Sequence, residues 1–308
     1  MRTHPAWMIA SVCLALSPQL GIAQQEQRPV YRAGVASVFV NVSVKEGNVP
    51  IAGLAEEDFA VFDNGVRQKI DTLGFEPVPI DLTLFQDTSN SQAGRIESLK
   101  EDVRNIAALL RPGDRIRLLT LDFQVKDVFG WQPAGTRLDL SAVRLGHNSA
   151  VYDPIFAAMM HQPDPDRRHL IVALTDGVDG GSAVGSQAVL DAARHSEGVL
   201  HLVLLQRSRG SGRVAGYWMP THADRDGLRR LKEAAELTGG RVYTQIFRAN
   251  VISNFRQAFD EFRQSYVLRY TPSGVPANGW HDIKVELPAY PRAMIRARKG
   301  YFGAASGF

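Results

Sequence analysis

A short polar segment directly after an apolar run carries the residues best suited to chemistry. Asp87, Ser89 and Ser91 stand at every second position, immediately after the apolar stretch 80–85. This spacing lets a looping backbone direct one carboxylate and two hydroxyls towards a common centre. A hard cation such as Mg²⁺ prefers oxygen ligands in octahedral geometry at about 2.0–2.1 Å and keeps some of its water. The segment is therefore a candidate metal site. An ordinary polar turn is the alternative, because Asp and Ser are common turn residues.

Two distant segments could complete such a site. Asp176 directly follows the apolar run 169–175, and Ser149 precedes a stretch with helical spacing over 150–160. Open α/β sheets bind ligands beyond the carboxyl ends of their strands, which is where Asp176 and the first segment would lie. The three segments together favour a metal site over a polar turn.

The combined motifs resemble those of a von Willebrand factor type A (VWFA) domain with its metal-ion-dependent adhesion site (MIDAS). Asp87, Ser89 and Ser91 match the DxSxS motif of that family. Asp176 lies in a segment that looks like the final aspartate loop of that family, and Ser149 stands where the family has threonine. Serine keeps the hydroxyl of threonine but lacks the methyl group that restricts its rotamers.

The resemblance implies a role for each of these residues. Asp87, Ser89 and Ser91 would bind a divalent metal directly or through water. Ser149 would bind it directly when a ligand is present, and Asp176 would complete the shell, usually through water. One coordination position would stay open for a carboxylate offered by a partner protein. Mg²⁺ is the expected metal, Mn²⁺ and Ca²⁺ are the alternatives, and no residue is assigned a catalytic role.

Other polar residues near these segments have supporting assignments. Asp153 is expected to cap or brace its loop and Asp179 to lie behind the metal ligands, with a solvated acid as the alternative for each. His147 is expected in a loop near the rim of the site. The remaining histidines are scattered and lack the spacing of zinc ligands.

The order of predicted elements places the three segments on one sheet. Strand and helix patterns alternate with short links from residue 79 to 264, which indicates a doubly wound, mainly parallel, Rossmann-like α/β domain. Strand patterns flank it on both sides, and we expect them to pair as a small antiparallel β-sandwich-like module. Two separate β units are the alternative. The predicted organisation is a signal peptide at 1–23, an N-terminal β module at 24–78, a VWFA domain at 79–264 and C-terminal β strands at 265–308.

The first 23 residues have the pattern of a secretory signal peptide. Arg2 and His4 precede an apolar run that contains Cys13, and cleavage is expected after Ala23. The run is too short to span a membrane, and an uncleaved anchor is the alternative. We therefore expect a periplasmic or extracellular protein without cysteine, because Cys13 is the only one in the chain. No later segment is apolar enough to be a membrane span.

The composition excludes several classes of protein. The chain has 308 residues, is 44% hydrophobic and carries 35 lysines and arginines against 32 acidic residues. These values are typical of a globular protein. A formal charge of +3 without a dense basic run does not indicate a nucleic-acid partner. The oligomeric state stays open.

The sequence therefore predicts an exported VWFA-domain binding protein, not an enzyme, that engages a protein partner through a divalent-metal site. A metal-assisted hydrolase is the first alternative. It requires a general base near the ion, for which Asp179 or His147 could be nominated. A structural envelope protein with a vestigial site is the second.

Overall fold

The structure is a computed structural model. It describes residues 37–47, 49–75, 78–89, 94–121, 124–146, 149–162, 164, 166–206, 222–246 and 252–303. The predicted signal peptide, His147 and the third residue of the DxSxS segment, Ser91, lie outside the described residues.

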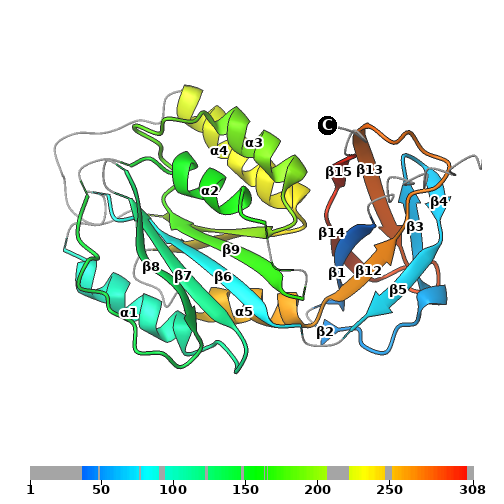
Figure 1. Ribbon diagram of the computed structural model, residues 1–308, viewed down its shortest axis with the longest axis horizontal. Coiled ribbons are helices and arrows are strands. Elements are labelled where there is room, and N and C mark those ends of the chain that lie inside the picture. Colours follow the sequence, from blue (N-terminus) through cyan, green and yellow to red (C-terminus); the bar gives the residue numbers. More distant parts are fainter. Residues whose placement is uncertain are drawn as a thin grey trace, which may run out of the picture. The chain divides into compact units, whose positions relative to one another are not determined.

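A six-stranded sheet forms the centre of the α/β part of the chain (Figure 1), in the order β11-β10-β9-β6-β7-β8. Strands β6 (Ile80–Gln86) and β9 (Arg168–Thr175) are parallel neighbours at its middle, and every residue of both is buried. Continuous burial is expected for strands covered on both faces. The other strands of the sheet are β7 (Arg115–Leu121), β8 (Val125–Pro133), β10 (Val199–Gln206) and β11 (Val242–Ile246).

The edge strand β8 makes this sheet mixed. It pairs antiparallel with β7, whereas the other neighbours in the sheet are parallel. A parallel neighbour needs a crossover of about a dozen residues, and only residues 122–124 separate β7 from β8. The chain must therefore turn back on itself at this edge.

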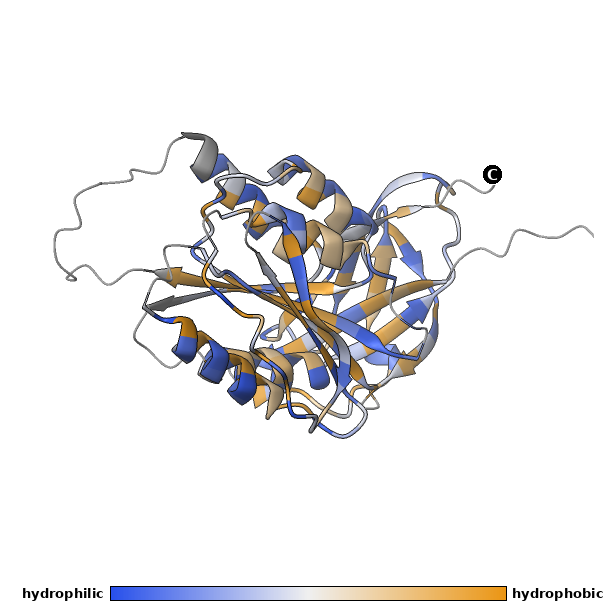
Figure 2. Cartoon of the chain, turned by 60° about the vertical axis from the view of Figure 1, so that its left-hand side comes forward, coloured by the Kyte–Doolittle hydropathy of each residue, from blue (hydrophilic) through white to orange (hydrophobic). Residues whose placement is uncertain are grey.

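Helices pack on both faces of the sheet (Figure 1). Helices α1 (Ile96–Ala107) and α5 (Ile252–Arg263) contribute to one core cluster. Helices α2 (Tyr152–Met159), α3 (Ser186–His195) and α4 (His222–Leu237) contribute to the other. Figure 2 shows hydrophobic residues concentrated on the strands and hydrophilic residues on the outer sides of the helices, as amphipathic helices require. Among the described helices, none is both long and apolar enough to cross a membrane.

Strands from the two ends of the chain share sheets. Strand β1 (Val38–Glu46) pairs antiparallel with β12 (Tyr266–Tyr270) and β14 (Met294–Ala297), and β3 (Ala60–Asp63) pairs with β13 (Gly279–Glu286). The two sheet orders are β14-β1-β12-β5, with β2 beside β1, and β15-β13-β3-β4. Their remaining elements are β2 (Val49–Pro50), a 3₁₀ turn at Glu56–Asp58, β4 (Val66–Gln68), β5 (Ile70–Gly74) and β15 (Gly300–Gly303). The exact domain boundaries stay a prediction.

The third N-terminal strand differs from its prediction. The residues after the hairpin turn at Asn64-Gly65 predict a single third strand over 67–75. The structure instead has β4 and β5 with a break at Lys69. Strand β4 pairs with β3, whereas β5 pairs with β12 of the other sheet. The break occurs because the chain changes sheets at this point.

A buried carboxylate ties these two β sheets together. Asp63 is fully buried and accepts hydrogen bonds of 2.9 Å from the hydroxyls of Tyr270 and Tyr301. Nδ1 of the buried His281 lies 2.7 Å from its other oxygen. Tyr270 lies on β12, Tyr301 on β15 and His281 on β13. The Asp63 side chain on β3 therefore contacts strands that lie more than 200 residues further along the chain.

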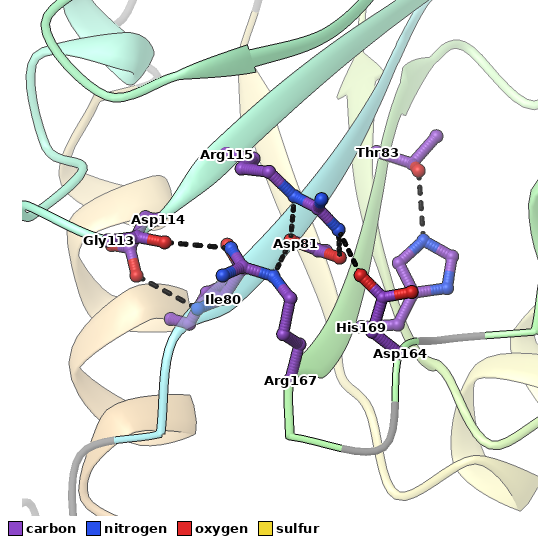
Figure 3. Close-up of polar contacts among 9 residues, drawn as sticks. All are labelled: Ile80, Asp81, Thr83, Gly113, Asp114, Arg115, Asp164, Arg167 and His169. Carbon is purple, nitrogen blue, oxygen red and sulfur yellow. Dashed lines mark hydrogen bonds and ion pairs between the residues drawn. The ribbon is translucent and has the colours of Figure 1, made fainter.

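A second buried carboxylate, Asp81, joins strands of the central sheet at their amino ends (Figure 3). Asp81 is fully buried at the start of β6 and pairs with Arg115 and Arg167. Arg167 also donates to the Gly113 carbonyl at 2.8 Å. These contacts join the amino ends of β6, β7 and β9, and leave the carboxyl ends of the same strands for the candidate site.

Two buried histidines should make the stability of the fold fall in acid. Burial lowers the pKa of His169 to about 3 and that of His201 to about 4. Both values are below the ordinary 6.5, so below pH 6.5 the unfolded chain binds protons that the folded chain does not. Their contribution to stability is complete above pH 6.5 and is lost as the pH falls towards 4.

Urea unfolding at pH 7, 6 and 5 would measure this pH dependence of the stability. Each histidine should add a slope to the free energy of unfolding that approaches about 1.4 kcal/mol per pH unit between pH 6 and 5 and is smaller between pH 7 and 6. The His169→Gln and His201→Gln variants should each reduce the slope by about that amount, and the double variant by the sum. Wild-type slopes in both single variants would contradict the assignment.

Candidate metal centre

The candidate site lies where β6 and β9 end side by side. Asp87 follows β6, and its backbone N–H donates to the Leu174 carbonyl of β9 at 2.9 Å. Gln86 is in register with Leu174, so the next residues of the two strands, Asp87 and Thr175, are neighbours. The parallel pairing thus joins two segments that are 88 residues apart.

Both oxygens of the Asp87 carboxylate accept hydrogen bonds. Asp87 is 1% exposed. Oδ1 accepts the backbone N–H of Ser89 at 2.9 Å, and Oδ2 accepts the hydroxyl of Thr175 at 2.9 Å. A carboxylate has about four acceptor positions, more than the hydrogen bonds from Ser89 and Thr175 occupy.

A second acid lies close to this carboxylate. Burial raises the pKa of Asp87, and the negative charge of Asp176 raises it further. No lysine or arginine among the described residues offsets these two effects on Asp87. A cation between the two acids would remove the repulsion and replace the hydration that Asp87 has lost.

The loop after β9 holds Asp176 in a tight turn. The Asp176 carboxylate accepts the backbone N–H of Val178 at 3.1 Å, and the Thr175 hydroxyl accepts that of Gly177 at 3.0 Å. Gly177 has a φ of +79°, and a Cβ at this position would lie 2.8 Å from Cδ1 of Leu228. The positive φ favours glycine at this position, and a Cβ would also make the end of the Leu228 side chain on α4 shift.

Ser149 joins this loop from the third segment. Its hydroxyl donates to the Val178 carbonyl at 2.5 Å, and its own carbonyl accepts the Gly180 N–H at 2.5 Å. A serine hydroxyl carries two acceptor lone pairs besides its donor, so a hydroxyl that donates in this way has the chemistry of an oxygen ligand. The segment of Asp87 also contacts the chain just before Ser149, since the Gly146 N–H donates to the Thr88 carbonyl at 2.8 Å.

Asp153 and Asp179 act as braces. Asp153 accepts the backbone N–H groups of Ala183 and Val184 at 3.0 and 2.9 Å, so it braces a loop as expected. Asp179 accepts the N–H of Val151 at 2.7 Å at the start of α2. Neither is merely a solvated acid, and together they lock α2 to the loop after β9.

Sequence reasoning missed the role of Thr175. It is fully buried, and its hydroxyl both orients Asp87 and fixes the turn to Gly177. The available signal was a hydroxyl residue at the end of an otherwise apolar strand. Ser182 was also missed, and its hydroxyl contacts Asp179 and the N–H of Tyr152.

The donor set suits a hard cation. The described candidates are carboxylates and hydroxyls: Asp87, Ser89, Ser149 and Asp176. Within the described residues no group of three or more His, Cys, Asp or Glu could hold a metal, so a site here depends on its hydroxyls. Oxygen ligands of this kind favour Mg²⁺, Mn²⁺ or Ca²⁺ over metals that prefer nitrogen or sulfur.

Comparisons with known proteins found similar solved structures, whereas protein-family models and curated proteins gave no match. The conserved hypothetical protein BatB from Bacteroides thetaiotaomicron is 12% identical over 60% of this chain and 98% of its own, with a TM-score of 0.43. A von Willebrand factor type A structure from Catenulispora acidiphila is 9% identical over 85% of this chain and 73% of its own, at 0.45. Proximal thread matrix protein 1 from the mussel byssus, with a zinc-occupied MIDAS motif, is 13% identical over 64% of this chain and 48% of its own, at 0.45.

Proposed function

We propose that this chain is an exported VWFA-type protein, with a doubly wound α/β domain, that binds a protein partner through a divalent cation. The cation would lie at the loops that follow β6 and β9. Export rests on the signal-peptide pattern of residues 1–23 and is part of the proposal.

The residues proposed to hold the cation are Asp87, Ser89, Ser91, Ser149 and Asp176. When bound, the metal would present positive charge and an open position to a carboxylate of the partner. The chain's own residues do the positioning. The Thr175 hydroxyl and the Ser89 N–H orient the Asp87 carboxylate, and the hydrogen bonds of the Ser149 segment hold its hydroxyl beside the loop of Asp176.

The observation that carries the proposal is the convergence of three distant segments around a buried carboxylate. Asp87 contacts Thr175 and Ser89, the Thr88 carbonyl receives the Gly146 N–H, and Ser149 contacts the loop of residues 178–180. A polar turn would not require these three segments to meet.

A non-catalytic role is part of the same proposal. The nominated general base Asp179 already accepts backbone N–H groups at the start of α2 and a hydroxyl from Ser182. A carboxylate engaged in this way is poorly placed to take a proton from a metal-bound water. Ester and phosphoester substrates should therefore show no turnover that depends on the metal.

The partner can be sought by affinity capture from envelope extract. Wild-type protein and the Asp87→Asn variant would be compared with Mg²⁺ and with a chelator. A partner retained only by the wild type with Mg²⁺ is expected. A partner retained equally under all conditions would show that binding does not use the proposed site.

The Ser149 hydroxyl should contribute directly to metal affinity. We expect Ser149→Ala to weaken Mg²⁺ or Mn²⁺ binding about tenfold, because it removes one oxygen ligand of a sparse set. Ser149→Thr should preserve or strengthen binding, because it keeps the hydroxyl and restricts its rotamers. Isothermal titration calorimetry would measure both. A large loss in Ser149→Thr, or none in Ser149→Ala, would remove Ser149 from the set of ligands.

A further inference from the structure

A groove runs along α1. It is lined on one side by residues of α1 between Glu97 and Ala107, with Ala108 and Leu110 just after the helix, and on the other side by residues 135–141. Its volume is about 790 Å³. We call it the α1 groove. None of its lining residues belongs to the proposed metal site.

The floor of the α1 groove is apolar. Ala107, Leu110 and Leu138 pack against the core cluster under α1 but are only partly buried. They therefore leave apolar surface open to a ligand. Burial of such surface contributes about 25 cal/mol per Å² to binding.

The rim of the α1 groove carries two arginines without a contacting acid. Arg104 and Arg137 are exposed, and among the described residues no carboxylate forms an ion pair with either guanidinium. Arg104 acts on Glu97 through its charge, but Lys100 is the residue that contacts Glu97, at 2.9 Å.

The remaining acid of the α1 groove is engaged locally. Asp139 accepts the backbone N–H of Ser141 at 2.9 Å, within its own turn. Arg104 and Arg137 therefore stay available to an external anion. Two available guanidiniums above an apolar floor are complementary to a ligand that alternates carboxylates with apolar groups.

The length of the α1 groove suits a short extended segment. The 12 residues of α1 span about 18 Å at about 1.5 Å per residue. An extended peptide covers that length with about five or six residues at about 3.3 Å each.

We propose that the α1 groove binds an extended acidic peptide segment of a partner protein, with its carboxylates facing Arg104 and Arg137 and its apolar side chains on Leu110 and Leu138. This contact goes beyond the proposed metal-dependent function. It uses different residues and needs no cation.

Fluorescence anisotropy with the full chain would test the proposal. The probe is a labelled hexapeptide that alternates glutamate and leucine, and the control peptide has glutamine for each glutamate. Saturable binding of the glutamate peptide alone is expected. It should weaken with added salt and stay unchanged with a chelator, so that its failure and that of the metal site are distinguishable.

Variants would locate the binding. Arg104→Ala and Arg137→Ala should each lower the affinity for the glutamate peptide about threefold, and the double variant about tenfold. Arg256→Ala is the matched control, because Arg256 is also exposed but lies on α5 outside the α1 groove. Equal losses in all three single variants would overturn the proposal.

Other occupants are outcomes of the same experiment. Full displacement of the peptide by millimolar inorganic phosphate at constant ionic strength would assign the α1 groove to small anions and overturn the proposal. Dimerisation of the chain in sedimentation, lost in Arg104→Ala, would assign it to a second copy and also overturn the proposal. Absence of saturable peptide binding would overturn it directly.

Discussion

Replacement of Asp87 by asparagine is expected to abolish divalent-metal binding while the chain stays folded. The variant removes the one fully buried carboxylate of the proposed set and keeps a side chain of nearly the same size. A loss of metal affinity of at least about a hundredfold, or about 2.7 kcal/mol, is expected from the loss of a charged ligand.

The fold should tolerate this substitution for an electrostatic reason. In the metal-free protein Asp87 is buried and repelled by Asp176, and both effects raise its pKa. A neutral side chain removes the repulsion, and its amide oxygen can still accept a hydrogen bond from Ser89 or Thr175. The metal-free variant should therefore be at least as stable as the wild type.

Calorimetric titration with Mg²⁺ and Mn²⁺, and thermal unfolding with and without metal, would measure both effects. At a metal concentration of 100 times the wild-type Kd, the wild type should gain about 2.7 kcal/mol of stability and the variant about 0.4 kcal/mol or less. Asp191→Asn is the matched control, since Asp191 is an exposed acid on α3. Absence of metal binding to the wild type, or equal binding to both proteins, would refute the site.

The second large effect is expected at Gly240, in the turn before β11. A Cβ at this position would lie 1.8 Å from the carbonyl oxygen of Leu200 and 3.2 Å from that of Ala235. Both contacts are backbone atoms, in β10 and α4. A rotamer change therefore cannot relieve the overlap, and the turn must move away from the sheet.

We expect Gly240→Ala to lower the free energy of unfolding by about 4 kcal/mol or more, or to prevent soluble expression. Displacement of the turn would break two backbone hydrogen bonds: from Gly240 N–H to Ala235 at 2.8 Å, and from Leu202 N–H to Arg241 at 2.9 Å. Gly130→Ala is the matched control, because nothing lies within 4 Å of a Cβ there. It should change stability by about 0.5 kcal/mol or less. Similar urea-unfolding curves for the two variants would contradict the steric argument.

Much of the central sheet follows from the sequence. Residues 80–85 and 169–175 are apolar runs of the kind typical of buried strands, and they lie within β6 and β9, where every residue is buried. Apolar residues recur at helical spacing over 96–110, and the helix forms over 96–107, with Leu99, Val103 and Ile106 buried. Such patterns are local, because the spacing of apolar residues reports which faces of an element are covered.

The candidate metal site stays a prediction, and its residues came from two kinds of signal in the sequence. Spacing at a strand end pointed to Asp87 and Ser89, and the resemblance to the VWFA motifs added Ser149 and Asp176. Thr175 was not singled out, since only the register of β6 against β9 brings its hydroxyl to the Asp87 carboxylate. Ser91 lies outside the described residues, so its assignment stays a prediction.

The sequence by itself determined the type of each main element and the chemistry at the strand ends, because apolar periodicity and polar spacing are local properties of the chain. Only the tertiary structure decided which distant groups meet. It decided that β8 is antiparallel, that Asp63 contacts Tyr270, Tyr301 and His281, and that Arg104 and Arg137 share a groove. Each of these features depends on two or more elements that are separate in the sequence. Packing and strand register decide which elements meet, and the neighbouring residues in the chain do not.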